Sequence, residues 1–262
     1  MKSFSPSVFS EALHRCHDYR ALIQGWKKAA KKMGVKLQPY SNYDGETLYY
    51  LSNGCPESSK DFSLYLSAGI HGDEPAGPTA LLRWAECHVK ELKKIHYLIF
   101  PCLNPWGIKN NFRYDSKGND LNRFFKAGVK LVPFVAWRRL LKQFRFDAAL
   151  MLHEDYDAQG VYLYELDRTG DRWGADLIQA VQSWIVPEPR RRVDGRRCKD
   201  GLIQPVIDLK RLNLHPEAIY LYFHHTDRSI TIETPSEFSL ARRVEAQVAM
   251  IQKAVQRLIQ RR

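Results

Sequence analysis

Short apolar runs alternate with helix-like segments along most of this chain, and this alternation limits how it can fold. Runs of the strand type end near residues 70, 104, 153, 166 and 235, and segments with helical periodicity lie between several of them. Strands that alternate with helices form a parallel or mixed sheet covered by helices on both faces. We therefore predict an α/β fold with a mixed, mostly parallel twisted sheet, formed as a single domain over residues 1–262.

Apolar periodicity and turn residues predict the individual elements. Strands are expected at 48–53, 62–70, 95–104, 147–153, 160–166, 218–225 and 229–235, with the first two side by side. Helices are expected at 6–33, from about 79 to 92, and at 132–144, 174–185 and 236–259. Ser236 is the expected N-cap of the last helix. The polar segment 105–128 is long for a connection in a compact domain, which is typical of a functional loop.

Composition excludes several classes of protein. A hydrophobic content of 44% is enough for a packed core and excludes a disordered chain. No window of about eighteen apolar residues is present, so no membrane span is expected. The first twenty residues lack the apolar region of a secretory signal, and the five cysteines show neither a C-x-x-C motif nor a disulfide framework. These features favour a cytoplasmic protein with reduced thiols.

The formal charge of +11 comes from 40 basic and 29 acidic residues, and part of the excess lies in the basic loop 190–197. A solvated loop is one interpretation, and an electrostatic funnel for an anionic partner is another. Nucleic acid is not favoured as a partner, because the basic run has no interleaved aromatic residues and no recognition motif.

Ligands of open α/β sheets bind beyond the carboxyl ends of the strands, so polar residues at those positions are the candidates for chemistry. They are His71, Glu74, Asn104, His153, Glu154 and Glu233. Two histidines and one carboxylate are a sufficient donor set for catalytic zinc, which keeps a further position open for water. Glu233 is the candidate to take a proton from that water. A single histidine after a strand is usually an ordinary surface or core residue, so the remaining histidines receive no role.

Five motifs occur in one order between residues 69 and 235. They are "GIHGDEPAG", "NPWG", "NNFRYDSKGNDLNR", "LMLHED" and "TIETP". This order resembles the zinc metallocarboxypeptidase superfamily, which includes carboxypeptidase A, murein peptide amidase and the aspartoacylase/succinylglutamate desuccinylase branch. The fold implied is a phosphorylase/hydrolase-like, zinc carboxypeptidase-like α/β domain.

The resemblance implies a role for each matching residue. It implies that one Zn²⁺ ion is bound by His71, Glu74 and His153, and that Glu233 is the general base. Arg113 matches the arginine that polarises the scissile carbonyl and stabilises its oxyanion. Asn122 and Arg123 match the pair that binds a substrate carboxylate, which an arginine fork can grip bidentately. In the first motif, Gly69 and Gly72 are expected to let the backbone bend so that the ligands converge.

Some features depart from the better-known members of the superfamily. The 78 residues between Glu74 and His153 are few, which resembles the compact branch containing murein peptide amidase and aspartoacylase. Trp106 stands where many relatives carry Asp. No catalytic tyrosine is assigned, although Tyr220 and Tyr222 lie in the expected region. Arg228 and the basic loop 190–197 are candidates to set a preference for acidic substrate groups.

The function expected from these residues is zinc-dependent hydrolysis of an amide bond next to a free carboxylate, as in a metallocarboxypeptidase or a muropeptide amidase. The substrate would be a small peptide, and a cell-wall-derived muropeptide is one candidate. An N-acyl amino-acid deacylase of the aspartoacylase or desuccinylase type is the alternative. A non-catalytic protein that binds an anionic polymer is a more remote alternative. The sequence does not indicate the oligomeric state.

Overall fold

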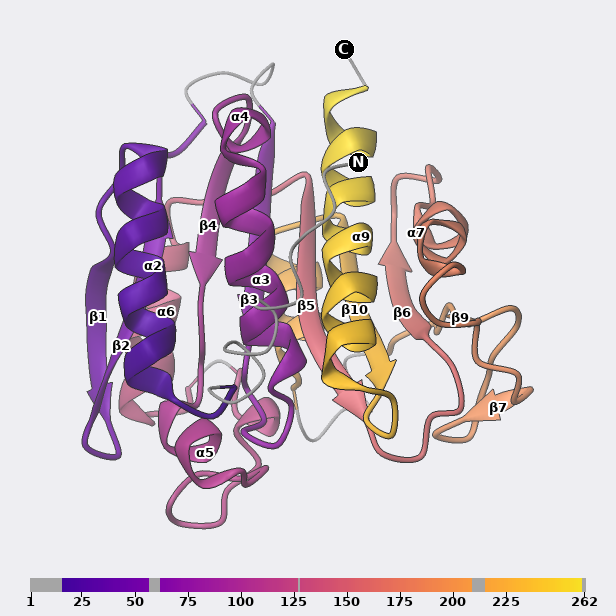
Figure 1. Ribbon diagram of the computed structural model, residues 1–262, viewed down its shortest axis with the longest axis horizontal. Helices are drawn as coiled ribbons and strands as arrows, with labels where there is room; N and C mark the ends of the chain where they lie inside the picture. The colour runs from indigo at the N-terminus through magenta and orange to yellow at the C-terminus, as the bar shows by residue number, and fades with distance from the viewer. Residues whose placement is uncertain (1–15, 57–61, 127, 209–214, 261–262) are drawn as a thin grey trace.

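The computed structural model describes residues 16–56, 62–126, 128–208 and 215–260. Within these ranges eight strands form one mixed sheet in the order β1-β2-β4-β3-β5-β10-β6-β9 (Figure 1). The bounds of these strands are β1 Gln38–Tyr43, β2 Glu46–Ser52, β3 Ser63–Ala68, β4 His96–Phe100, β5 Ala148–Asp155, β6 Tyr162–Asp167, β9 Leu202–Ile203 and β10 Arg228–Pro235. The central strands β4, β3, β5 and β10 run parallel to one another, and β1, β2 and β6 add antiparallel pairings.

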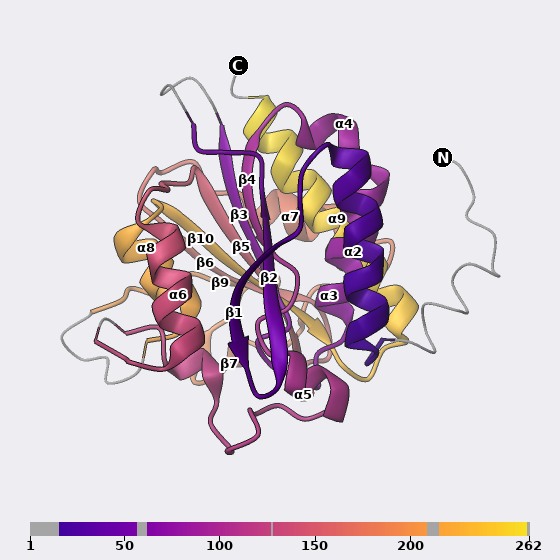
Figure 2. The same ribbon diagram turned by 90° about the vertical axis from the view of Figure 1, so that its left-hand side faces the viewer.

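Helices cover both faces of this sheet, as the side view shows (Figure 2). One face carries α2 Tyr19–Met33, α3 Ala76–Cys87, α4 Val89–Leu92, α7 Gly174–Val181 and α9 Leu240–Ile259. The opposite face carries α6 Val132–Leu141 and α8 Glu217–His224. The predicted single-domain α/β fold is confirmed. No helix of the described ranges is long and apolar enough to cross a membrane.

The alternation of side chains along the strands divides the core into two layers. On β5, Ala148, Leu150 and Leu152 pack under α3 and α9, whereas Ala149 and Met151 pack on the side of α6. Successive side chains of a strand point to opposite faces, so the next residue, His153, lies on the α6 side. Glu154 therefore points to the α9 side, where it pairs with Arg243.

The chain reverses its direction of travel across the sheet at β3, and this places a crevice at the carboxyl ends of β3 and β5. From β3 the chain passes through α3 to β4 on one side, and it then returns through α6 to β5 on the other side. Such a switch point is where ligands bind in open α/β sheets. The sheet topology thus places the turn after β3 and the end of β5 together at a ligand-binding position.

Several predicted elements differ from the structure. Segment 218–225 was expected as a strand because it is aromatic and β-branched, but it is helix α8. Both sheet positions beside β10 are already filled by β5 and β6, so the segment packs over the sheet, where Ser229 Oγ donates to the Ala218 carbonyl at 3.0 Å. Tertiary context overrides local propensity here.

Other corrections concern neighbours and boundaries. Strand β4 lies between β2 and β3, so the two strands expected to be adjacent do not pair, and β1 was not predicted. Helix α3 begins at Ala76, and a break at His88 separates it from α4. The final helix is capped by Ser239, since Ser236 lies in the turn that follows β10. Of the helical segment predicted at 6–33, residues 6–15 lie outside the described ranges, and the helix occupies Tyr19–Met33.

Candidate metal centre and substrate cavity

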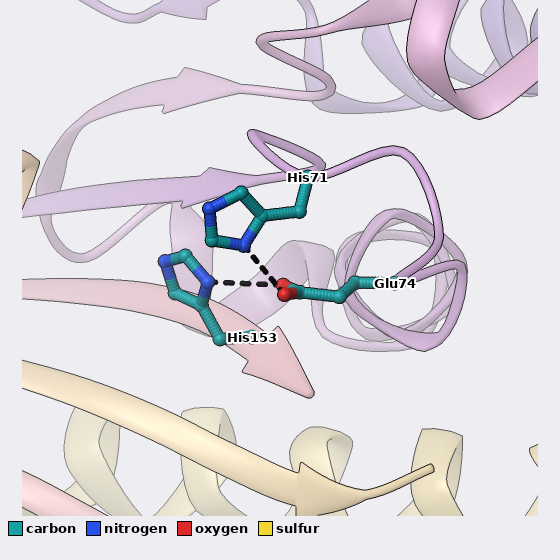
Figure 3. Close-up of side chains that lie close together, drawn as sticks. All are labelled: His71, Glu74 and His153. Carbon is teal, nitrogen blue, oxygen red and sulfur yellow. Dashed lines mark hydrogen bonds and ion pairs between the residues drawn. The ribbon is translucent and has the colours of Figure 1, made fainter. Parts of the chain in front are cut away.

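Glu74 lies between the imidazoles of His71 and His153 at the carboxyl ends of β3 and β5 (Figure 3). His71 Nδ1 is 2.5 Å from Glu74 Oε1, and His153 Nδ1 is 2.9 Å from Oε2. Each residue is only 3% exposed, and one potential ligand atom from each lies within 4.8 Å of the other two. Three buried donors thus converge, two from the turn between β3 and α3 and one from β5.

The Glu74 carboxylate and the two imidazoles stabilise one another in their charged forms. Burial alone would raise the pKa of Glu74, but the two imidazoles lower the pKa to about 2. Burial alone would lower the pKa of His71, but Glu74 and Asp120 raise it to about 9. The carboxylate therefore needs positive charge beside it. Both imidazoles turn Nδ1 toward the Glu74 carboxylate. A divalent cation fits this site, because one carboxylate and two imidazoles are a donor set of catalytic zinc sites.

Asp120 contacts the His71 ring on the side away from Glu74. Its Oδ1 accepts from His71 Nε2 at 3.2 Å, so the nitrogen opposite the one that faces Glu74 is also held. Its Oδ2 lies 3.1 Å from Arg113 Nη2 and 3.7 Å from Arg123 Nη2. A carboxylate that holds the second nitrogen of a ligating histidine fixes the tautomer and the orientation of its ring.

The turn that carries His71 depends on two glycines for different reasons. Gly69 has a φ of +64°, a left-handed conformation that favours glycine. A Cβ atom on Gly72 would lie 1.9 Å from the carbonyl carbon of Gly107, so Gly72 is needed for close backbone contact. The first two sequence motifs therefore pack directly on each other. Asn104 belongs to this contact, because its Oδ1 accepts from the Gly107 amide at 2.9 Å and caps α5 Pro105–Asn110.

Glu233 enters the same region from β10. It is the register partner of His153 in the parallel pairing of β10 and β5, and it is half-buried. Burial is the main cause that raises the pKa of Glu233 to about 8, and Glu74 and Asp155 act in the same direction. His153 and Arg113 oppose this shift. Glu233 is thus a carboxyl group that can exchange a proton near neutral pH.

The loop 105–128 supplies three polar groups to the site. Arg113 Nη1 is 3.5 Å from Glu74 Oε1, and Arg113 Nη2 pairs with Asp120. Asn122 lies in the short 3-10 helix η1 Leu121–Arg123, and its Oδ1 accepts from the backbone N–H of Glu217 at 3.0 Å. Since the carbonyl oxygen of Asn122 is used in this way, its NH₂ group is the donor that it offers to the cavity. The N-terminus of α8 therefore orients Asn122.

One cavity of about 580 Å³ unites these groups, and its size is that of a small-molecule site. The residues expected to bind the metal, to bind the substrate or to act in catalysis all line it, namely His71, Glu74, Arg113, Asn122, Arg123, His153 and Glu233. The arrangement combines a buried ligand set, a carboxyl group that can exchange protons and two arginines.

Known proteins share both the fold and part of the sequence. Residues 60–163 match the Succinylglutamate desuccinylase/Aspartoacylase catalytic domain. A proposed metallopeptidase from Shewanella denitrificans OS217 aligns with a TM-score of 0.80 and 22% identity over 93% of this chain and 91% of its own. A metallo-carboxypeptidase from Burkholderia cenocepacia aligns with a TM-score of 0.66 and 17% identity over 90% of this chain and 68% of its own. The chain therefore has a carboxypeptidase-like α/β fold.

A similar proposed metallopeptidase from Shewanella amazonensis SB2B aligns with a TM-score of 0.81 and 21% identity, over 93% of this chain and 94% of its own. No curated protein matches the sequence. The Shewanella proteins therefore share the architecture of this chain over nearly its whole length. The shares covered also show that these chains are similar in length to this one.

Some residues that the sequence suggested for the site have structural roles instead, or lie outside the cavity. Both oxygens of Glu154 are used, since Oε2 accepts from the Ala76 N–H at 2.8 Å and Oε1 pairs with Arg243. Arg228 is fully buried, 3.1 Å from Asp167 and over the Trp173 ring, so it does not face the cavity. Neither Tyr220 nor Tyr222 lines the cavity, and Trp106 also lies outside its lining.

Other residues of the site were not predicted. Asp120 stands in the "NDLNR" motif beside Asn122, but its link to His71 depends on loop geometry that the sequence does not reveal. Tyr162 pairs in register with Glu233 across β6 and β10 and also lines the cavity. Arg196 reaches the cavity from the basic loop, for which the sequence analysis named a range and no single residue.

Proposed function

We propose that this protein is a zinc-dependent hydrolase that cleaves an amide bond next to a free carboxylate. The observation that carries the proposal is that one cavity holds the His71–Glu74–His153 group, Glu233 and a pair of arginines. His71, Glu74 and His153 would hold the ion. A bound zinc ion supplies Lewis-acid polarisation of a carbonyl and acidifies water.

The side chains of the chain itself divide the remaining work. Glu233 accepts a proton at its carboxylate and returns it to the leaving amine, a task suited to a group whose pKa lies near neutrality. Arg113 provides a fixed positive charge for the oxyanion that develops on the scissile carbonyl. Asn122 and Arg123 bind the free carboxylate of the substrate, so that the amide bond is positioned at the zinc site.

The substrate class proposed first is a small peptide with a free carboxylate, and a muropeptide is a candidate within it. The superfamily fold supports this choice, because solved structures with this fold include metallo-carboxypeptidases. The alternative is an N-acyl amino-acid deacylase. The match of residues 60–163 to the Succinylglutamate desuccinylase/Aspartoacylase catalytic domain favours this alternative. Both reactions would use the same metal ligands and the same arginines.

Zinc content and hydrolysis measured together test the proposal. The purified protein should contain one zinc ion, and it should cleave members of a panel of peptides and N-acyl amino acids. A chelator should abolish this activity, and Glu233→Gln should lower it by orders of magnitude. If the zinc-loaded protein cleaves no member, or if Glu233→Gln is fully active, the proposal is wrong. Binding of anionic ligands without any hydrolysis would favour the non-catalytic alternative.

A further inference from the structure

The cavity extends beyond the metal ligands along a floor built by β6 and β10. Three antiparallel register pairs form this floor, and all six side chains line the cavity. The pairs are Tyr162–Glu233, Tyr164–Thr231 and Leu166–Ser229. They lie on one face because residues two apart on a strand point the same way. Glu233 and Ser229 are four positions apart on β10, which corresponds to about 13 Å. The substrate can therefore extend past the bond that is cut.

A hairpin stands beside this floor. It consists of β7 Arg192–Val193 and β8 Arg196–Arg197, which pair antiparallel. The two residues that join them, Asp194 and Gly195, have φ values of +49° and +70°. Two consecutive positive φ values are characteristic of the type I′ turn, which matches the twist of a hairpin. The basic loop 190–197 thus contains an ordered element.

Contacts with the floor fix the position of this hairpin. The Tyr164 hydroxyl donates to Asp194 Oδ2 at 2.7 Å. Val193 is buried in a cluster with Tyr162 and Cys198, which also packs against Tyr164. The hairpin is therefore attached to the same tyrosines that form the floor, and a side chain on its inner side is held over the cavity.

Arg196 is that side chain, since it lines the cavity from the hairpin. Its neighbour Arg197 does not line the cavity, as expected for consecutive residues of a strand. Arg190 and Arg192 are engaged elsewhere, with Glu188 and with the Gly195 carbonyl. Within the described ranges the Arg196 guanidinium has no salt-bridge partner, and the nearby Asp194 carboxylate already accepts from Tyr164. Among the residues that the structure describes, Arg196 is therefore a cavity-lining cation without an acidic partner of its own.

We propose that Arg196 recognises a second anionic group on the substrate, so that the preferred substrate carries an acidic side chain beside its free carboxylate. This inference rests on the proposed function and specifies its substrate class. Arg113, Asn122 and Arg123 approach the cavity from the 105–128 loop, whereas Arg196 approaches from the hairpin beyond β6. Two carboxylates of one small molecule can thus be bound by different arginines, each with the fork geometry that suits a carboxylate.

Equilibrium binding tests this assignment without turnover. Calorimetric titration of the zinc-supplemented protein would compare N-acetylglutamate with N-acetylglutamine, each as the L and the D form. These two ligands share the α-carboxylate and differ in the charge of the side chain. The wild-type protein should bind the glutamate form of one enantiomer roughly ten to a hundred times more tightly, as expected for a charge-assisted hydrogen bond. Arg196→Gln should bring the two constants together.

Arg197→Gln is the matched control, because it removes the same charge from the same strand on the side away from the cavity. It should leave the glutamate-to-glutamine ratio as in the wild type. The inference is overturned if the wild-type protein binds both ligands equally, or if both variants change the ratio to the same extent.

Hydrolysis of peptides that end in Glu or Gln separates the proposed role of Arg196 from the proposed hydrolase function. Cleavage without a charge preference refutes only the role of Arg196, whereas a binding preference without cleavage of any substrate refutes only the hydrolase.

Discussion

Asp120 joins the imidazole of His71 to the guanidinium of Arg113. One carboxylate oxygen accepts from His71 Nε2 at 3.2 Å, and the other lies 3.1 Å from Arg113 Nη2. The His71 imidazole and the guanidinium groups of Arg123 and Arg113 hold the pKa of Asp120 well below its usual range, although burial acts against them. The candidate metal centre and the group proposed to bind the oxyanion are thus positioned by the same side chain.

Replacing Asp120 by Ala should weaken zinc binding. Removing the carboxylate frees the His71 ring, and loss of such an outer partner typically costs a factor of 10 to 100 in metal affinity. Competition with a chromophoric chelator measures this change. Asp157→Ala removes an exposed carboxylate near the end of β5 and should leave the affinity unchanged. Equal affinities of the Asp120 variant and the wild type would show that Asp120 does not orient His71.

Replacing Gly72 by Ala should destabilise the fold strongly. The new methyl group would meet the backbone of Gly107 at 1.9 to 2.4 Å, and backbone atoms cannot move aside as the end of a side chain can. A loss of about 3 kcal/mol in the free energy of unfolding is expected for such overpacking. Gly118→Ala is the control, because it has a φ of +79° with no atom within 4 Å and should lose only about 1 kcal/mol. Denaturant unfolding that ranks the two variants the other way would contradict the packing argument.

Glu217 should make stability depend on pH. It is 1% exposed and accepts from the Tyr65 hydroxyl, which in turn accepts from Trp137 Nε1 at 3.0 Å. Burial raises the pKa of Glu217 from 4.5 to about 7, so the folded state binds its proton more tightly than the unfolded state does. The resulting stability is complete below pH 4.5 and is lost as the pH rises through 7.

Glu217→Gln removes this titration while it keeps an acceptor for Tyr65. Relative to the wild type, the variant should therefore gain about 3 kcal/mol of unfolding free energy between pH 4.5 and pH 8. Denaturant unfolding of both proteins across this range measures the difference. A difference that stays constant with pH would show that Glu217 does not titrate between these limits.

Arg123→Gln should weaken binding of substrates and products with a free carboxylate, and it should affect their amidated forms much less. The lost interaction is a charge-assisted hydrogen bond, for which a reduction of roughly ten- to a hundredfold is expected. Comparison of kcat/KM for each acid and its amide measures the effect. Arg145→Gln removes an exposed arginine that pairs with Asp227 and should change neither value. Equal losses on the acid and the amide would mean that Arg123 does not bind the carboxylate.

The sequence predicts the fold where local pattern and tertiary environment agree. The apolar run of β5 is buried on both faces, so its composition alone identifies it as a central strand. In α8 the local pattern and the tertiary environment disagree. Its aromatic and β-branched residues favour a strand, but β5 and β6 already occupy both edges of β10. The hairpin of β7 and β8 was not predicted, because two strands of two residues each are too short to show a periodic pattern.

Some residues of the candidate site could likewise be predicted from the sequence, and others could not. Residues such as His71, Glu74 and His153 stand at the ends of recognisable strands, and parallel strands bring those ends together, so the sequence could place them in one site. Asp120 and Arg196 contribute through the path of a loop and a hairpin. The local sequence does not reveal the distance from Asp120 to His71 or the direction in which Arg196 points.

Zinc stoichiometry tests the central claim most directly. Elemental analysis after dialysis against limiting free zinc should find one ion per chain in the wild type. Substitution of His153 by Ala should lose that ion, whereas His224→Ala should retain it, because His224 is exposed on α8 and lies outside the cavity lining. A wild-type protein without zinc, or a His153→Ala variant that still binds one ion as tightly as the wild type, would contradict the proposed metal centre.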